Sequence, residues 1–346
     1  RDSKYIYVST NLQDDWEAEG YRQSDIYQIN ATDGSMDQLT DRDGPDGNPT
    51  PSPDGKSLAY TGFDNKQMAT QISHIYVMNL KTRKIKEIKT KLDRGVSNLS
   101  WSGDSKNIIF TYATEGNTKL AKTTLNGKTA VLASSLGRGY SSATNGKFVI
   151  LTTRPDIPSD LAVGNTKGGK TKVITSVNAD LFANKELGKV EEIWYKSSHD
   201  GLDIQGWIIK PPGFDPSKKY PLILEIHGGP FANYGDRFDL EKQLMAAQGY
   251  VVLYTNPRGS TSYGEKFAQL IHHDYPGDDF YDLNSGVDAA IKKGYIDEDN
   301  LFVTGGSGGG VLTCWMIGRT TRFKAAVTVY PVINWYSFAL YSDIPR

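Results

Sequence analysis

The segment Gly305–Gly310 places five glycines around a single serine, Ser307, and it constrains the fold more than any other stretch of the chain. The apolar run Asn300–Val303 precedes it and predicts a buried strand, and Val311–Gly318 follows and predicts a buried helix. A strand that turns directly into a helix leaves no room for side chains beside the turn, which explains glycines two positions before and after the serine. The stretch therefore predicts a sharp strand–turn–helix connection that lifts the serine hydroxyl out of the turn; the alternative is a glycine-rich turn with an incidental serine.

The chain beyond Lys185 alternates strands and helices. A hairpin is expected across Ser198–Gly201, and the continuous apolar run Tyr220–Ile226 is typical of a strand buried on both faces of a parallel sheet. Further strands are expected at 250–255, 300–303 and 325–329, with helices at 238–248 and 280–293. This alternation predicts a doubly wound, mostly parallel sheet in a domain spanning 186–346, with ligands at the carboxyl ends of its strands.

The first part of the chain, residues 1–185, repeats a turn followed by a short apolar strand. The turns are Asp2-Ser3-Lys4, Asp54-Gly55-Lys56, Asp104-Ser105-Lys106 and Asn145-Gly146-Lys147. Such residues tolerate the positive φ of hairpin turns. About four repeats of roughly 40–50 residues, each with several short strands, predict part of a β-propeller. An irregular β-sandwich is the alternative. The acidic and aromatic cluster Asp14–Glu19 is expected to be a solvated loop rather than a binding face.

Charge and composition narrow the class of partner. The net charge of −1 gives no strong field for nucleic acid or anionic lipid. No apolar run approaches the roughly 18 residues of a membrane span. The single cysteine, Cys314, excludes an internal disulfide and a cysteine-rich metal site. We expect no metal and no cofactor. The compartment stays open between bacterial cytoplasm and periplasm, and homo-oligomerisation stays open too.

Ser307 is the candidate nucleophile. A serine hydroxyl needs donors where negative charge develops on the substrate oxygen. The loop His227–Pro230 follows a predicted buried strand and offers bare backbone amides at the carboxyl edge of the sheet. By the geometry of α/β-hydrolases, the backbone N–H groups of Gly308 and Gly229 are expected to form the oxyanion hole.

A catalytic base for Ser307 is not evident. The triad in this fold runs serine, acid, histidine, yet no histidine follows Ser307. The histidines are His74, His199, His227, His272 and His273, all upstream. His227 is expected to shape the oxyanion loop, and Asp343 follows the serine too closely to be the usual acid. We expect the chain to be incomplete at both ends, with a missing C-terminal segment or another chain supplying the Asp and the His.

The second part of the chain resembles the prolyl oligopeptidase family of serine peptidases, in its acylaminoacyl-peptidase and dipeptidyl-peptidase branches. The motifs that carry the resemblance are Glu225–Pro230, Asn256–Gly264, Gly305–Gly310 and Arg322–Val327. The resemblance implies a propeller joined to an α/β-hydrolase domain, and hydrolysis of short peptides through Ser307 with the propeller excluding folded proteins. It also implies that the segment around Val332 and Trp335 walls the pocket for the residue before the scissile bond. The alternative is that Trp335 is ordinary core.

Two departures from the family pattern stand out. Many relatives carry a larger residue directly after the nucleophile, where this chain has Gly308; only a backbone amide is needed there. The doublet Glu191-Glu192 lies at the domain junction, unlike the paired glutamates of the dipeptidyl branch, and is expected to be surface strand. An esterase of the same fold and a catalytically inactive propeller scaffold remain the competing functions.

Overall fold

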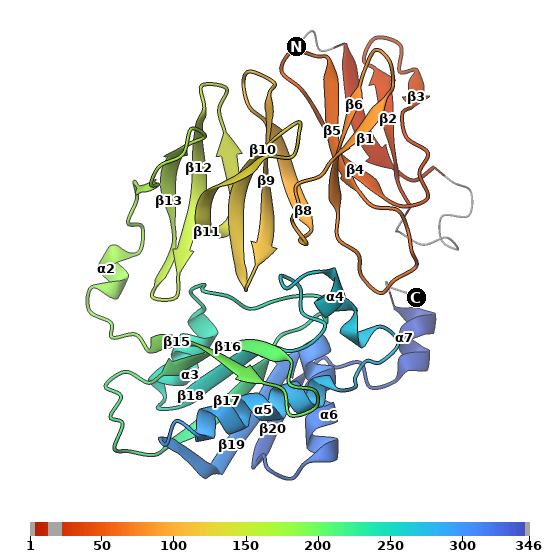
Figure 1. Ribbon diagram of the computed structural model, residues 1–346. Coiled ribbons are helices and arrows are strands. Elements are labelled where there is room, and N and C mark those ends of the chain that lie inside the picture. Colours follow the sequence, from red (N-terminus) through yellow and green to blue (C-terminus); the bar gives the residue numbers. More distant parts are fainter. Residues whose placement is uncertain (1–3, 13–22, 343–346) are drawn as a thin grey trace. The chain divides into compact units, whose positions relative to one another are not determined.

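The computed structural model describes residues 4–12 and 23–342 (Figure 1). The chain divides into two compact units, residues 1–152 with 160–175 and residues 153–159 with 176–346. Residues 176–185, which the sequence assigns to the propeller, belong to the second unit in this division, and the domain boundary at 185 stays a prediction. The start of the first repeat (Arg1–Ser3), the acidic cluster Asp14–Glu19 and Asp343 lie outside the described residues.

The first unit consists of short antiparallel strands. In the described ranges they form three sheets, ordered β1-β2-β3, β4-β5-β6-β7 and β8-β9-β10-β11-β12-β13-β14. Their bounds are β1 (Tyr5–Thr10), β2 (Asp25–Asn30), β3 (Met36–Gln38), β4 (Asp46–Pro51), β5 (Ser57–Gly62), β6 (His74–Asn79), β7 (Ile85–Ile88), β8 (Val96–Trp101), β9 (Asn107–Thr114), β10 (Asn117–Thr124), β11 (Thr129–Ser142), β12 (Lys147–Arg154), β13 (Ile157–Asn165) and β14 (Lys172–Val173).

The repeated turns of the sequence are repeated structures. In three of them the backbone N–H of the lysine donates to the side chain two residues earlier at 3.1 Å, from Lys56 to Asp54, Lys106 to Asp104 and Lys147 to Asn145. The residue between has a φ of 69° at Gly55, 59° at Ser105 and 82° at Gly146. The positive φ is the reason for glycine or a small polar residue at this position.

Strand β11 belongs to two of these repeats at once. Its first part pairs with β10 and its second part with β12, with shifts of register between Leu136 and Tyr140. This one strand joins two four-stranded blades into the seven-stranded sheet. Neighbouring sheets also pack on each other, since Ile75, Ile108 and Phe110 share one buried cluster and Trp101 Nε1 donates to Thr50 O at 2.9 Å.

The second unit is built on a six-stranded sheet, counted within the described residues, ordered β15-β16-β18-β17-β19-β20. The β15–β16 and β16–β18 pairs are antiparallel, and the pairs from β18 through β17 and β19 to β20 are parallel. The bounds are β15 (Lys189–Lys196), β16 (Asp203–Lys210), β17 (Tyr220–Ile226), β18 (Val251–Asn256), β19 (Ile296–Gly306) and β20 (Ala325–Val329). The expected hairpin across Ser198–Gly201 is present.

The connections between these strands carry the helices α3 (Leu240–Ala247), α4 (Glu265–Ala268), α5 (Asp279–Ile291) and α6 (Gly308–Arg319), with a 3₁₀ turn η1 (Gln269–Ile271). The short helix α2 (Ala179–Phe182) precedes β15, and α7 (Trp335–Tyr341) follows β20. Helix α3 begins after Asp239, whose carboxylate accepts from the backbone N–H of Lys242 at 3.2 Å, as a capping residue does. None of the helices in the part of the chain that the structure describes is long and apolar enough to cross a membrane.

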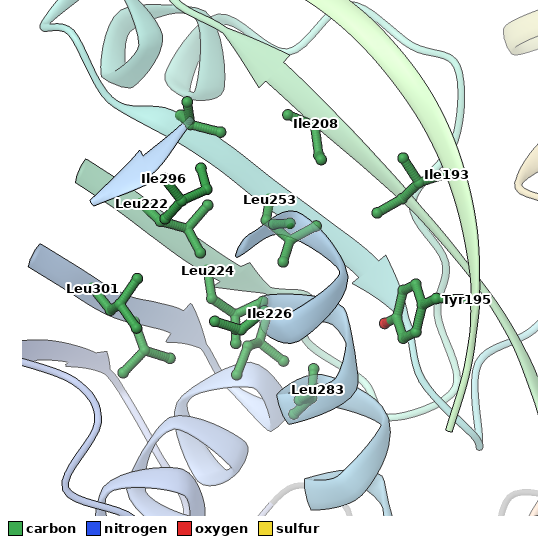
Figure 2. Close-up of a cluster of buried hydrophobic side chains, with 14 of the residues drawn as sticks. Ile193, Tyr195, Ile208, Leu222, Leu224, Ile226, Leu253, Leu283, Ile296 and Leu301 are labelled. Atoms are coloured by element: carbon green, nitrogen blue, oxygen red, sulfur yellow. The ribbon is translucent and has the colours of Figure 1, made fainter. Parts of the chain in front are cut away.

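The sheet is covered on both faces, as its apolar strands predict. On one face Leu224 and Leu253 pack with Leu283 of α5 (Figure 2). On the other, Trp207 and Val252 pack with Ala246 of α3, among others. All six residues of β18 are buried in consequence. Each fully buried aliphatic side chain contributes on the order of 2 kcal/mol, so this core fixes where the carboxyl ends of β17 and β19 lie.

Candidate active site

Ser307 stands alone between a strand and a helix. Strand β19 ends at Gly306 and α6 begins at Gly308. Ser307 has φ 56° and ψ −121°, a conformation that a non-glycine residue adopts only under restraint, and its side chain is exposed. The restraint is visible in the backbone, because Ser307 N–H donates to Val329 O at 3.0 Å and Val311 N–H donates to Ser307 O at 3.0 Å.

The glycines two residues before and after Ser307 are required by space. A Cβ at Gly305 would lie 2.5 Å from Gly309 O and 2.8 Å from Ile226 O. A Cβ at Gly309 would collide with Ile226 O and lie 2.9 Å from His227 O. Neither glycine has a positive φ. The crossing of α6 over the end of β17 is therefore so close that only a residue without a side chain fits.

The loop after β17 lies against this turn. A Cβ at Gly228 would be 3.4 Å from Ser307 Cβ, and a Cβ at Gly308 would be 2.9 Å from Gly229 N. Gly308 is the first residue of α6, so its N–H has no acceptor within the helix. The structure thus brings together Ser307, Gly308 and Gly229.

His227 is committed to the loop. Its side chain is 8% exposed, Nδ1 lies 2.7 Å from Gly228 O and Nε2 lies 2.9 Å from Ser260 Oγ. Since a carbonyl oxygen only accepts, Nδ1 carries the proton. Burial lowers the pKa of His227 to about 4, so the ring is neutral. Both nitrogens hold the loop in place, and neither is directed to Ser307.

The remaining histidines have other partners. His199 Nε2 lies 3.1 Å from Asp278 and its ring stacks on Tyr281. The rings of His272 and His273 lie 3.8 Å apart, and His74 faces Glu87. Within residues 4–12 and 23–342, no histidine forms a hydrogen bond with Ser307.

Trp335 lies at the start of α7 and is 46% exposed. The alternative of an ordinary core tryptophan stays a prediction as well. Its ring meets Tyr275 edge to face at 6.3 Å. Val332 is half-buried in the segment between β20 and α7. Their role as a pocket wall stays a prediction.

Tyr275 is a contact that sequence reasoning missed. Its hydroxyl donates to Gly308 O at 2.9 Å, and burial raises the pKa of Tyr275, so it remains a donor at any working pH. The residues that follow are also tied to α6, because Trp315 Nε1 donates to Gly277 O at 3.2 Å. No motif predicts this contact; the only signal is the turn-forming Tyr275-Pro276-Gly277 run.

Sequence reasoning also missed a buried ion-pair cluster around Lys242, next to the loop His227–Pro230. Lys242 is 2% exposed, and its Nζ lies 2.7 Å from Glu225 and 2.6 Å from Asp239. Tyr234 OH donates to Glu225 at 3.0 Å, and its ring meets His227 edge to face at 5.2 Å. Burial raises the pKa of Glu225, against the lowering effect of Lys242. Through Tyr234, this cluster packs against His227 and helps to hold the loop in place.

Arg258, from the motif Asn256–Gly264, and the doublet Glu191-Glu192 all have side-chain partners in the structure. Arg258 pairs with Asp282, with Nη2 2.8 Å from Oδ1 and Nε 2.9 Å from Oδ2. Glu191 pairs with Lys210 at 2.7 Å and with Lys293. Glu192 accepts from Trp194 and Gln205. The glutamate doublet is thus occupied within its strand and its neighbours. Among the described residues, no group of three His, Cys, Asp or Glu side chains could hold a metal ion.

Comparison with known proteins agrees with this arrangement. Residues 236–345 match the prolyl oligopeptidase family, and residues 16–182 match the TolB β-propeller domain. The prediction of a partial propeller joined to an α/β-hydrolase domain is therefore confirmed.

Individual relatives match over much of the chain. Dipeptidyl-peptidase 5 of Porphyromonas gingivalis is 31% identical over 318 residues, which cover 90% of this chain and 46% of that protein. A Bacillus subtilis protein named as an uncharacterized peptidase is 43% identical over 198 residues, 57% of this chain and 30% of that protein. A solved acylaminoacyl peptidase in complex with Z-Gly-Gly-Phe-chloromethyl ketone matches with a TM-score of 0.86 at 26% identity, over 99% of this chain and 53% of its own. The chain thus spans less than half the length of these two curated relatives.

Proposed function

The chain belongs to the prolyl oligopeptidase family, and on that premise we propose that it is part of a serine peptidase that hydrolyses short peptides through an acyl-enzyme on Ser307. Residues 186–346 contribute the hydrolase domain. Residues 1–185 contribute blades of a propeller that excludes folded proteins from the site. The relatives are named as peptidases, which supports peptides as the substrate class.

The observation that carries the proposal is the exposed, restrained Ser307 beside two glycine amides. In the reaction, a base takes the proton of Ser307 Oγ as that oxygen attacks the peptide carbonyl carbon. The carbonyl oxygen gains the negative charge, and the N–H groups of Gly308 and Gly229 donate to it. The C–N bond then breaks, the amine leaves with a proton, and water hydrolyses the ester. One such donor is worth on the order of 3 kcal/mol in the transition state.

The base of this reaction is proposed to lie outside the sequence. The described histidines have other partners, so a further segment of the protein or another chain would supply the His and the Asp. For the polypeptide 1–346 alone we therefore expect little turnover, limited to the effect of the oxyanion donors and of binding. Rapid peptide hydrolysis by this polypeptide would contradict that expectation.

We also propose an apolar or aromatic residue before the scissile bond. The similar acylaminoacyl peptidase structure holds Z-Gly-Gly-Phe-chloromethyl ketone, in which phenylalanine lies next to the reactive ketone. Val332 and the half-exposed Trp335 offer an apolar surface of matching chemistry in this chain. Self-association is left as a prediction.

The test is covalent labelling of the full-length protein with a fluorophosphonate probe. We expect one adduct on Ser307 and none in Ser307→Ala, which leaves the fold unchanged because the side chain is exposed. Absence of labelling in the wild type would favour the inactive scaffold. A panel of short peptides against simple esters then separates a peptidase from an esterase.

A further inference from the structure

Tyr275 touches two parts of the proposed site at once. Its hydroxyl donates to Gly308 O at 2.9 Å, and its ring meets the ring of Trp335 at 6.3 Å. Gly308 supplies one proposed oxyanion donor, and Trp335 is the proposed wall for the substrate side chain. The tyrosine comes from the loop between η1 and α5, far from either in sequence.

The start of α6 needs restraint from outside. Three consecutive glycines, Gly308–Gly310, open the helix, and glycine loses more conformational freedom on ordering than any other residue. With no side chain, Gly308 is held only through its main chain. A hydrogen bond to its carbonyl oxygen restrains the Gly308–Gly309 peptide, which adjoins the Ser307–Gly308 peptide that carries the proposed oxyanion donor.

The loop that carries Tyr275 is itself held on α6. Trp315, two turns along the helix, donates from Nε1 to Gly277 O at 3.2 Å. Gly277 N–H in turn donates to Asp279 Oδ1 at 3.1 Å at the start of α5. The loop therefore lies along the first half of α6 and is attached to it at two separate points, which makes Tyr275 a fixed donor rather than a mobile one.

We propose that Tyr275 is a positioning residue for hydrolysis: its hydroxyl restrains the Gly308–Gly309 peptide next to the proposed oxyanion donor, and its ring orients Trp335. The inference rests on the proposed function for its catalytic consequence. Its structural part, a restraint on the glycines of the turn, stands independently of activity.

The kinetic test uses the full-length protein with Tyr275→Phe, Tyr275→Ala and the matched control Tyr295→Phe. Tyr295 is 5% exposed and its buried hydroxyl has no hydrogen-bond partner in the described structure. Tyr295→Phe therefore removes a buried hydroxyl, as Tyr275→Phe does, but breaks no hydrogen bond. We expect Tyr275→Phe to lower kcat about tenfold with KM unchanged, because the ring still contacts Trp335. Tyr275→Ala should also raise KM for substrates with an aromatic residue before the scissile bond. Tyr295→Phe should match the wild type.

A second readout does not need activity. In hydrogen exchange of the full-length protein, the segment 305–312 should exchange several-fold faster in Tyr275→Phe than in wild type or Tyr295→Phe. Equal exchange in all three would overturn the inference, even in an inactive protein. An unchanged kcat in Tyr275→Phe, or an equal loss in Tyr295→Phe, would overturn it as well. A wild type that no fluorophosphonate labels would instead defeat the proposed function and leave the exchange result to decide the inference.

Discussion

Two turns of this chain use glycine for opposite reasons. In the first unit, Gly55 has φ 69° and open space around it, with no atom within 4 Å of the place that a Cβ would take. In the second unit, Gly309 lies in α6 without a positive φ, but a Cβ there would meet the backbone of Ile226 and His227. The propeller turn needs a backbone conformation, whereas the turn at Ser307 needs room.

This difference decides what each site accepts. The next repeat places Ser105 at the position of Gly55, with φ 59°, so the propeller turn tolerates a small side chain at a modest cost. No such exchange is open at Gly309, because the obstruction is the main chain of another strand. Glycine frequency alone does not distinguish the two cases.

Each unit also contains a buried carboxylate, and the two carboxylates differ in their partners. Asp46 in the first unit has an ion pair with Arg42 at 2.7 Å, and burial raises its pKa to about 6 despite that partner. Asp279 in the second unit accepts from Gly277 N–H, while its Oδ2 has no partner in the described structure. Burial raises the pKa of Asp279 to about 7.

The largest expected effect is that of Gly309→Ala. We expect a loss of at least about 4 kcal/mol in the free energy of unfolding, because the new methyl group meets a backbone carbonyl that cannot move without shifting β17. Urea unfolding measures this. Gly318→Ala in the same helix, where nothing lies within 4 Å, is the matched control and should be neutral or stabilising. A loss of unfolding free energy for Gly309→Ala as small as that for Gly318→Ala would show that lack of space does not explain the glycine at position 309.

Asp279→Asn should change the pH dependence of stability. In the native state the carboxyl holds its proton up to about pH 7, while the unfolded chain releases it near pH 4. The native state therefore binds more protons in that window, and the free energy of unfolding falls as pH rises, by on the order of 4 kcal/mol in total. Urea unfolding of the wild type between pH 4 and pH 8 should show this fall, and Asp279→Asn should flatten it.

Asp46→Asn tests the same effect in the first unit. The pH range over which the Asp46 carboxyl holds its proton in the native but not in the unfolded state is narrower, from about pH 4 to about pH 6. Its share of the slope should be smaller, because Arg42 offsets part of the burial cost. An equal or larger share at Asp46 would show that the ion pair does not separate the two carboxylates.

The smallest effect is expected for Gly55→Ala. The positive φ costs an alanine about 1 kcal/mol, and no atom obstructs it. Urea unfolding should therefore shift only slightly. A loss as large as that of Gly309→Ala would mean that the propeller turn, too, is limited by space.

Much of the fold could be predicted from local pattern. The strand Ala325–Val329 and the hairpin across Ser198–Gly201 follow from apolar runs and turn residues, and both are observed where expected. The turn at Ser307 follows from its glycines. These features depend on neighbouring residues in the sequence, which is why they can be read from it.

Contacts between distant segments could not be predicted. Strand β19 begins at Ile296, earlier than the expected Asn300, because Ile296 pairs with Tyr220 across a shift in register. Lys242 looks like a solvated helix residue until Glu225 and Asp239 are placed beside it. Tyr275 meets Gly308 only once the sheet has brought their segments together.

The strand β11, shared by two blades, sets the unit of local opening in the propeller. A blade with four strands of its own can separate from its neighbour by losing side-chain contacts alone. The two blades that share β11 cannot separate in this way, because β11 forms backbone hydrogen bonds with both β10 and β12. We therefore expect local opening in this unit between the sheet β4–β7 and the sheet β8–β14, which share no strand, and we expect the two blades within β8–β14 to unfold together.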